Sequence, residues 1–135
     1  MRPRWLAAVL LCAGLAGCFN VQSGDLFQLT RTGQGKQLTL LFNDSGTVAC
    51  NGGAAKTLPD PLLLEARDLA TTLNDDAQAG LHIAPPANAV FLYAIKLQNG
   101  TITFPDTAGA VHPELAQAEQ LALNTAQQAC GIGGG

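Results

Sequence analysis

The stretch FLYAIKLQNGTITF, residues 91–104, indicates the fold more clearly than any other part of the chain. Apolar side chains alternate with others along both halves of it, which is the period-2 pattern of half-buried strands. Asn99-Gly100 between the halves is the strongest short signal for a two-residue hairpin turn. This turn predicts two cross-strand pairs on one face of a sheet, Leu97 with Ile102 and Ile95 with Phe104.

A similar pattern lies nearer the N-terminus. Residues 26–30 and 37–43 have the alternation of two strands, with a Gly-containing turn between them. Asp44-Ser45-Gly46 suits a three-residue hairpin loop with glycine in the left-handed position. This loop pairs Leu40 with Cys50, so the Cys50 side chain is expected on the apolar face.

Each hairpin leads into a helical pattern. Asp60-Pro61 predicts an N-cap followed by proline at the first helical position, and His112-Pro113 opens a second helix that Gly131 should end. The expected buried stripes are Leu62, Ala66, Leu69 and Leu73 in the first helix and Leu115, Ala118, Ala122 and Ala126 in the second. The two halves could record a duplicated ββα unit or merely share the same turn and cap signals.

These patterns predict one α+β domain over residues 25–131. We expect a mainly antiparallel sheet of about five strands with two helices packed on one face, in the order β-ββα-ββα. Residues 132–135, which include three consecutive glycines, are expected to form a flexible tail.

Composition narrows the class of protein. Hydrophobic residues make up 47 % of the 135 positions and charged residues 13 %, which excludes a disordered chain. The net charge of −3 provides no basic surface for phosphates, so no nucleic-acid partner is expected.

The N-terminus has the three parts of a secretory signal. Arg2 and Arg4 precede an uncharged run over residues 5–17, which is shorter than the ~20 residues of a membrane-spanning helix. The run ends in Leu15-Ala16-Gly17-Cys18, and this sequence resembles the lipobox of bacterial lipoproteins. An ordinary signal peptide, cut at a small-residue site such as Ala-Gly-Leu-Ala at 13–16, is the alternative.

The resemblance implies how the chain is processed and where it resides. Cleavage between Gly17 and Cys18 would remove the signal peptide, residues 1–17, and Cys18 would carry a diacylglyceryl thioether and fatty acyl chains such as palmitate. Residues 18–24 would then be the acylated cysteine and a short tether. The domain is therefore expected on the extracytoplasmic side of the cell membrane, bound to the lipid bilayer through Cys18. The whole chain resembles small bacterial lipoproteins, a likeness that implies no activity.

Two cysteines remain after this processing, Cys50 and Cys130. In an oxidising compartment they are predicted to form one disulfide, which would fasten the second helix to the sheet. The alternative is a catalytic or metal-binding thiol pair, but C-x-x-C spacing and a nearby histidine are both lacking.

Residues for catalysis are sparse. The two histidines, His82 and His112, fall in a long connection and at a helix start, and the mature serines, Ser23 and Ser45, fall in the tether and a turn. No nucleophile–base set or metal-ligand spacing emerges from these positions. We therefore expect no enzymatic activity, no metal and no cofactor.

The sheet face opposite the helices is the remaining candidate for function. It is expected to be rich in threonine and nearly uncharged; its candidate binding residues are Thr39, Leu41, Leu92, Thr101 and Thr103. Such a face suits a non-enzymatic module that binds an envelope protein or a cell-wall component, although threonine is also simply a good strand residue. A small secreted hydrolase or a protease-inhibitor-like factor is the alternative.

Overall fold

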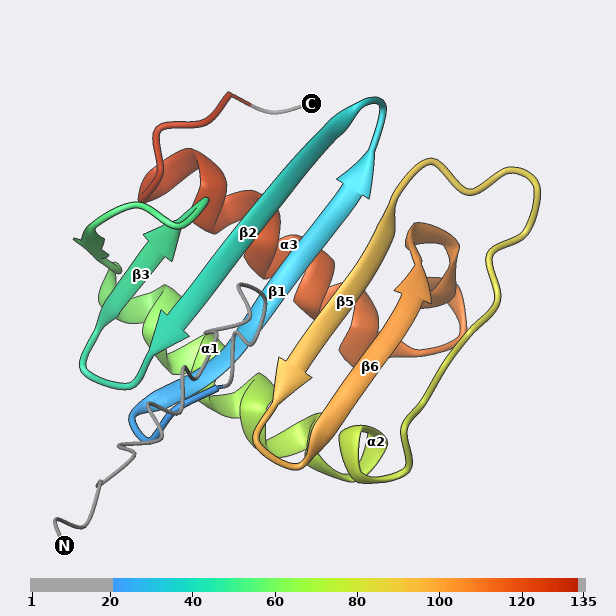
Figure 1. Ribbon diagram of the computed structural model, residues 1–135, viewed down its shortest axis with the longest axis horizontal. Coiled ribbons are helices and arrows are strands. Elements are labelled where there is room, and N and C mark those ends of the chain that lie inside the picture. The colour runs from blue at the N-terminus through green and yellow to red at the C-terminus, as the bar shows by residue number, and fades with distance from the viewer. Residues whose placement is uncertain (1–20, 134–135) are drawn as a thin grey trace, which may run out of the picture.

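The computed structural model describes residues 21–133. The predicted signal peptide, its cleavage site at Gly17 and the predicted acylation site at Cys18 lie outside this range. The described chain forms two layers, a twisted sheet and a layer of helices behind it (Figure 1). This arrangement confirms the predicted α+β class and the packing of the long helices on one face.

Six strands form one antiparallel sheet in the order β4-β3-β2-β1-β5-β6. The strands are β1 (Asp25–Gly33), β2 (Lys36–Asn43), β3 (Thr47–Cys50), β4 (Ala55–Thr57), β5 (Leu92–Leu97) and β6 (Gly100–Pro105). The helices are α1 (Asp60–Thr72), α2 (Asn74–Gln78) and α3 (Pro113–Gln128), and a 3₁₀ turn, η1, covers Asp106–Ala110.

The prediction of about five strands and two helices was wrong by one strand and one helix. β4 is an edge strand of three residues, all exposed, so it carries no apolar alternation that could identify it. α2 is a five-residue helix with a single buried side chain, Ala77, which is too short to produce a helical stripe. Both elements depend on neighbours for their backbone conformation more than on their own sequence.

The first hairpin has the predicted register. Leu40 pairs with Cys50 and Phe42 pairs with Val48, so the Cys50 side chain lies on the apolar face. The turn between β1 and β2 is tighter than expected, because β1 continues to Gly33 and pairs there with Lys36.

The second hairpin differs from the predicted register by two residues. Leu97 pairs with Gly100 and Ile95 pairs with Ile102, so Asn99-Gly100 is not the centre of the turn. Gly100 is required for another reason: a Cβ atom there would lie 2.0 Å from the carbonyl oxygen of Ala77 in α2. A shift of two residues keeps each side chain on its face, so the predicted apolar face is still correct.

Each of the two long helices, α1 and α3, has a proline at its start. Asp60 was predicted to be an N-cap, but the cap of α1 is Pro59, and Asp60 already lies in the first turn. His112 is the N-cap residue of α3, as predicted. α3 ends at Gln128, three residues before Gly131, whose φ of +64° turns the chain away.

The core fills the space between the sheet and the helices. All eight residues of the predicted helical stripes are buried in it, together with Leu121 and Thr125 of α3. On the sheet side the largest fully buried side chains are Phe27, Leu29, Leu40, Phe42, Ile95, Ile102 and Phe104. Sheet and helices thus enclose one continuous apolar layer.

A disulfide joins Cys50 and Cys130, as predicted, with 6.0 Å between their Cα atoms. Cys50 ends β3, and Cys130 follows the end of α3 rather than lying within its last turn. The bond therefore fixes the C-terminal end of α3 against the inner side of the sheet. Beyond it, Ile132 is half-buried and its amide donates to the carbonyl of Ala126 at 2.8 Å.

Candidate functional site

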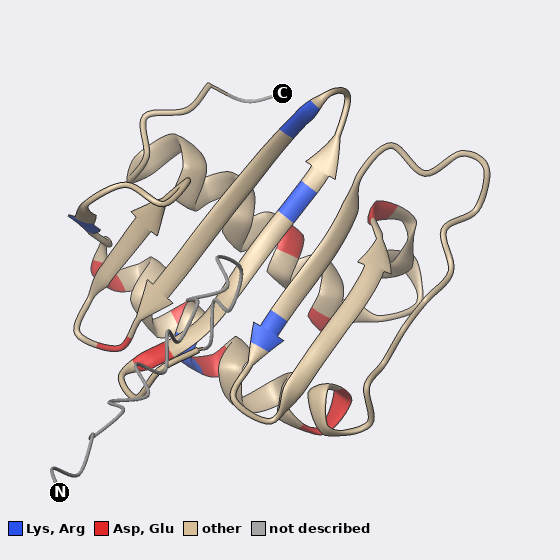
Figure 2. Ribbon diagram, in the orientation of Figure 1, with Lys and Arg blue, Asp and Glu red and all other residues tan. Residues whose placement is uncertain are grey.

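The sheet has an inner face, which packs on α1 and α3, and an outer face, which is turned away from them (Figure 1). Alternate residues of each strand project to the outer face, and these are mostly threonine, glutamine and small apolar residues. Figure 2 shows that the strands carry few charged residues, whereas acidic residues are spread over the helices and turns. The outer face is thus a nearly uncharged surface.

A hollow of about 550 Å³ lies over β1, β2 and β3 on this face, and we call it the central hollow. Thr39 and Leu41 line it, together with Gln28, Thr30, Asn51 and one charged residue, Lys96. The Thr39 amide donates to Asn51 Oδ1 at 2.8 Å, and the Asn51 amide donates to the Thr39 carbonyl at 2.7 Å. These bonds hold the bend after β3 against β2 and so shape one wall of the hollow.

A second hollow, of about 320 Å³, lies between β5, β6 and the segment 82–85, and we call it the loop hollow. Ile83 and Pro85 from the segment and Leu92 and Ala94 from β5 line it. The segment is fixed along the edge of the sheet, because the Thr103 amide donates to the Leu81 carbonyl at 3.0 Å and the Ile83 amide donates to the Thr103 carbonyl at 2.9 Å. This wall of the loop hollow is therefore ordered by backbone hydrogen bonds.

The predicted binding residues divide between the two hollows. Thr39 and Leu41 line the central hollow, and Leu92 and Thr103 line the loop hollow. Thr101 is exposed on β6 and lines neither of them. Thr30 lines both hollows, so they adjoin on β1.

Sequence reasoning missed three residues that shape these hollows, Asn51, Ile83 and Pro85. Asn51 has a φ of +53°, and the Asn-Gly-Gly sequence at 51–53 was a usable signal for a tight bend. Ile83 and Pro85 belong to a connection without periodicity, and only its pairing with β6 brings them to the outer face.

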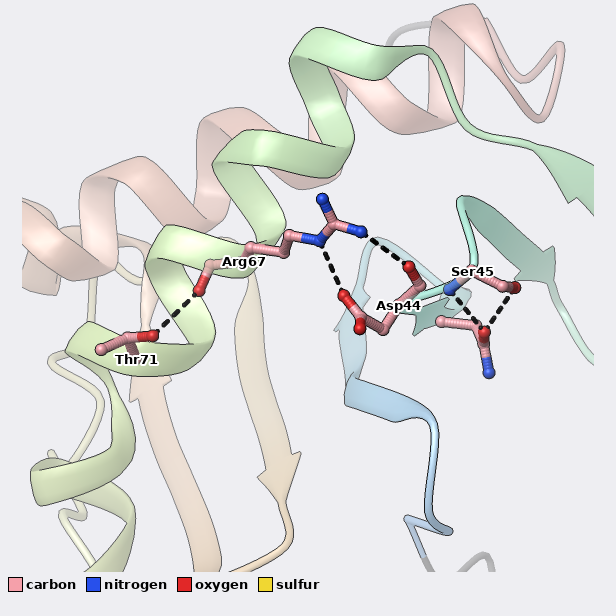
Figure 3. Close-up of polar contacts among 5 residues, drawn as sticks. Asp44, Ser45, Arg67 and Thr71 are labelled. Atoms are coloured by element: carbon pink, nitrogen blue, oxygen red, sulfur yellow. Dashed lines mark hydrogen bonds and ion pairs between the residues drawn. The ribbon is translucent and has the colours of Figure 1, made fainter.

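A third pocket, of about 550 Å³, lies at the end of the sheet where β1 begins. Figure 3 shows Arg67 of α1 reaching Asp44 in the turn between β2 and β3. Arg67 Nε lies 2.7 Å from Asp44 Oδ1, and Nη2 donates to the Asp44 carbonyl at 2.9 Å. The pair is exposed and connects a helix to a turn, so its contribution to stability is about 1 kcal/mol at most.

The two histidines and Ser45, which were considered for catalysis, have other partners. His82 Nδ1 contacts Thr103 Oγ1, and His112 Nδ1 lies 3.4 Å from Glu114 Oε1. Ser45 Oγ donates to the side-chain oxygen of Asn43 at 2.6 Å (Figure 3). His82 therefore lies beside β6 at the edge of the sheet, His112 lies at the start of α3, and Ser45 lies in the turn between β2 and β3.

Two adjacent aspartates, Asp75 and Asp76, lie in α2 and differ in exposure, because Asp75 is exposed and Asp76 is partly buried. Burial, followed by the nearby Glu114 carboxylate, raises the pKa of the Asp76 carboxyl group.

Over residues 21–133, no three histidine, cysteine, aspartate or glutamate side chains come together as ligands for a metal ion. In the same range, no helix has the length and apolarity needed to cross a bilayer. Comparison of the chain with known proteins found no matching family model, no matching curated protein and no matching solved structure.

Proposed function

We propose that this protein is a lipid-anchored module of the cell envelope that binds a partner through the outer face of its sheet. The single observation that carries the binding proposal is the adjoining pair of hollows on a face that the helices leave open and that is nearly uncharged, with Lys96 lining the central hollow. The partner is an envelope protein or a cell-wall component, and the activity is non-enzymatic.

Several features support the anchor. The lipobox-like Leu15-Ala16-Gly17-Cys18 follows a basic start and an apolar run. The disulfide between Cys50 and Cys130 suits an oxidising compartment outside the cytoplasm. Two acyl chains on one glyceryl group suffice for stable attachment, whereas one chain gives reversible binding.

The folded chain begins close to the proposed anchor. The Asp25 amide donates to the Gln22 carbonyl at 3.0 Å, and the Asp44 amide donates to the Gly24 carbonyl at 2.8 Å. Residues 22–25 are therefore part of the domain, and only residues 19–21 separate it from Cys18. Three residues span roughly 10 Å at most. The domain would stay near the bilayer, so a partner must approach it there.

The chemistry of the outer face defines how such a partner would bind. Hydroxyl and amide groups from Thr30, Thr39 and Gln28 offer hydrogen bonds, and Leu41 and Leu92 offer apolar contacts. With few charges involved, binding should depend little on ionic strength.

The anchor is tested by replacing Cys18 with serine. The wild-type protein should fractionate with membranes and partition into detergent, and Cys18→Ser should abolish both. Mass spectrometry of the mature N-terminus should find an acylated Cys18. An unmodified Cys18, or a mature N-terminus elsewhere, would contradict the anchor.

The binding face is tested by Leu41→Lys and Leu92→Lys, with Leu64→Lys as the matched control. Leu64 is an exposed leucine on α1, 59 % accessible, far from both hollows. Cross-linking in intact membranes, and binding to purified cell-wall fragments, should fail for the two outer-face variants and persist for the control. Full binding by folded outer-face variants would place the interaction elsewhere.

A further inference from the structure

A pocket of about 400 Å³ opens on the helix side of the sheet, beyond the end of the core. It lies between the strands β1 and β5 and the first half of α3, and its volume falls in the ~300–1,000 Å³ range of small-molecule sites. Arg31, Phe91 and Tyr93 line one side, and Ala116, Glu119 and Leu123 of α3 line the other. It is separate from the outer face and does not depend on the proposed function.

Arg31 makes one side of the pocket positive. It follows Leu29 on the inner face of β1 and pairs across the sheet with Leu38 and Tyr93, a position where an apolar residue would continue the core. Its Cζ atom lies 4.8 Å from the centre of the Phe91 ring, which is within the range of a cation–π contact. The ion pairs recorded within residues 21–133 are Arg67–Asp44 and His112–Glu114, and Arg31 takes part in neither.

Glu119 makes the opposite side acidic. Burial, and then the negative charge of Asp106, raise the pKa of Glu119 to about 7. Asp106 is fixed nearby because its two carboxylate oxygens accept from the Val90 amide at 3.2 and 3.3 Å. Glu119 is also closely packed, since a Cβ atom on Gly109 would lie 3.0 Å from its Oε2 atom. Within residues 21–133, no ion pair joins the Glu119 carboxyl group to a cation.

Tyr93 lies within the influence of both groups. Burial raises the pKa of its hydroxyl, Glu119 raises it further, and Arg31 lowers it through its charge and a hydrogen bond. Arg31 and Glu119 line the same pocket, and the ion pairs within residues 21–133 do not join them to each other. The pocket thus presents a guanidinium and a carboxyl group that are not paired with each other, and the Tyr93 phenol also lines it.

We propose that this pocket binds a small zwitterion with a free carboxylate and a free ammonium group, namely an amino acid or a short peptide with free ends. The ligand carboxylate would accept hydrogen bonds from the Arg31 guanidinium, whose planar donors match a carboxylate. The ligand ammonium group would pair with Glu119, in the field of Asp106. An apolar ligand side chain would contact Ala116 and Leu123.

The test compares zwitterions with analogues that lack one charge. Titration calorimetry of the folded protein would use L-leucine and L-alanyl-L-leucine, with N-acetyl-L-leucine lacking the ammonium group and L-leucinamide lacking the carboxylate. At least one zwitterion should bind, and both single-charge analogues should bind about tenfold or more weakly, because each loses a charge-assisted hydrogen bond. The length of the better zwitterion distinguishes an amino acid from a peptide.

Variants then assign the two ends of the ligand. Arg31→Gln and Glu119→Gln should each weaken zwitterion binding about tenfold or more, whereas Arg67→Gln and Glu65→Gln, the matched controls on α1, should not. Binding at pH 7 should release up to about half a proton, because an ammonium group lowers the pKa of Glu119 and displaces its proton. This release appears as a dependence of the measured enthalpy on the buffer, and Glu119→Gln should remove it.

Three outcomes would overturn the proposal. The first is that neither zwitterion binds the wild-type protein at millimolar concentration. The second is that N-acetyl-L-leucine or L-leucinamide binds as tightly as the zwitterions. The third is that folded Arg31→Gln and Glu119→Gln variants retain full affinity, which would place the ligand in another pocket.

Discussion

The two faces of the sheet are built from the same strands but differ in their side chains and in how deeply these are buried. On β2, Leu40 projects to the inner face and is fully buried, whereas its neighbour Leu41 projects to the outer face and is only half-buried. The inner face packs apolar side chains against α1 and α3, and the outer face presents hydroxyl and amide groups around two hollows. The comparison teaches that apolar burial is concentrated on the inner face, whereas outer-face side chains such as Leu41 stay partly accessible.

The disulfide is expected to make the largest single contribution on the inner side. Replacing both Cys50 and Cys130 with alanine should lower the free energy of unfolding by about 4 kcal/mol, because the unfolded chain regains the entropy of a long open loop. Urea unfolding measures this loss. A reducing agent should lower the stability of the wild-type protein and leave the double variant unchanged. Two titratable thiols in the folded wild-type protein would contradict the bond.

Leu40 and Leu41 offer a matched pair for the comparison of faces. Leu40→Ala should cost about 3 kcal/mol in free energy of unfolding, since it leaves a cavity in the core. Leu41→Ala should cost less than about 1 kcal/mol, because its side chain remains partly in water. Chemical denaturation of both variants measures the difference. Equal costs would mean that the outer face is covered by something and is not free for a partner.

Gly100 tests whether packing against α2 sets the register of the second hairpin. Gly100→Ala should cost about 2 kcal/mol, because the new Cβ would collide with the Ala77 carbonyl oxygen. Gly35→Ala is the control in the other turn, with a φ of +71° and open space around it, so only backbone strain of about 1 kcal/mol applies. Thermal unfolding compares the two. A Gly100→Ala variant as stable as the wild-type protein would refute the role of this contact.

The smallest effect concerns Glu119 and depends on pH. A raised carboxyl pKa means that the folded state binds more protons than the unfolded state between pH 4.5 and about 7, so stability falls as the pH rises through this window. Glu119→Gln should therefore stabilise the protein by about 1 kcal/mol at pH 8, after allowance for solvent exposure, and by nothing below pH 4.5.

Unfolding of the wild type and of Glu119→Gln across this pH range checks that prediction. Glu65→Gln on α1 serves as the control, because its stability should follow the wild-type pH dependence. A Glu119→Gln variant that also keeps the wild-type dependence would show that burial of Glu119 does not affect stability.

Most of the inner face could be predicted from the sequence. Period-2 alternation identified the strands and assigned Leu40, Ile95 and their neighbours to one face, and helical spacing identified the buried stripes of α1 and α3. The pairing of Cys50 with Cys130 followed from counting the cysteines left after processing. These inferences succeeded because each needs only the spacing of apolar residues along one element or the number of cysteines. None of them requires knowledge of contacts between distant segments.

The candidate site was predictable only in part. Leu41, Thr39, Leu92 and Thr103 were assigned to the outer face by alternation, and they do line hollows there. The walls of those hollows come from the bend at Asn51 and from the segment at Ile83. Neither has a repeating pattern, so their contribution depends on hydrogen bonds to strands distant in sequence.

By itself, the sequence determined which side chains face the core, because in a strand the direction of a side chain depends only on whether its position is odd or even. Tertiary structure decided the register between strands, which this odd–even alternation does not determine. The second hairpin is shifted by two residues where Gly100 meets Ala77, a change that keeps every side chain on its face and is therefore invisible to the pattern. The placement of Arg31 and Glu119 around one pocket was likewise decided by packing, because the two lie on elements that only the folded core brings together.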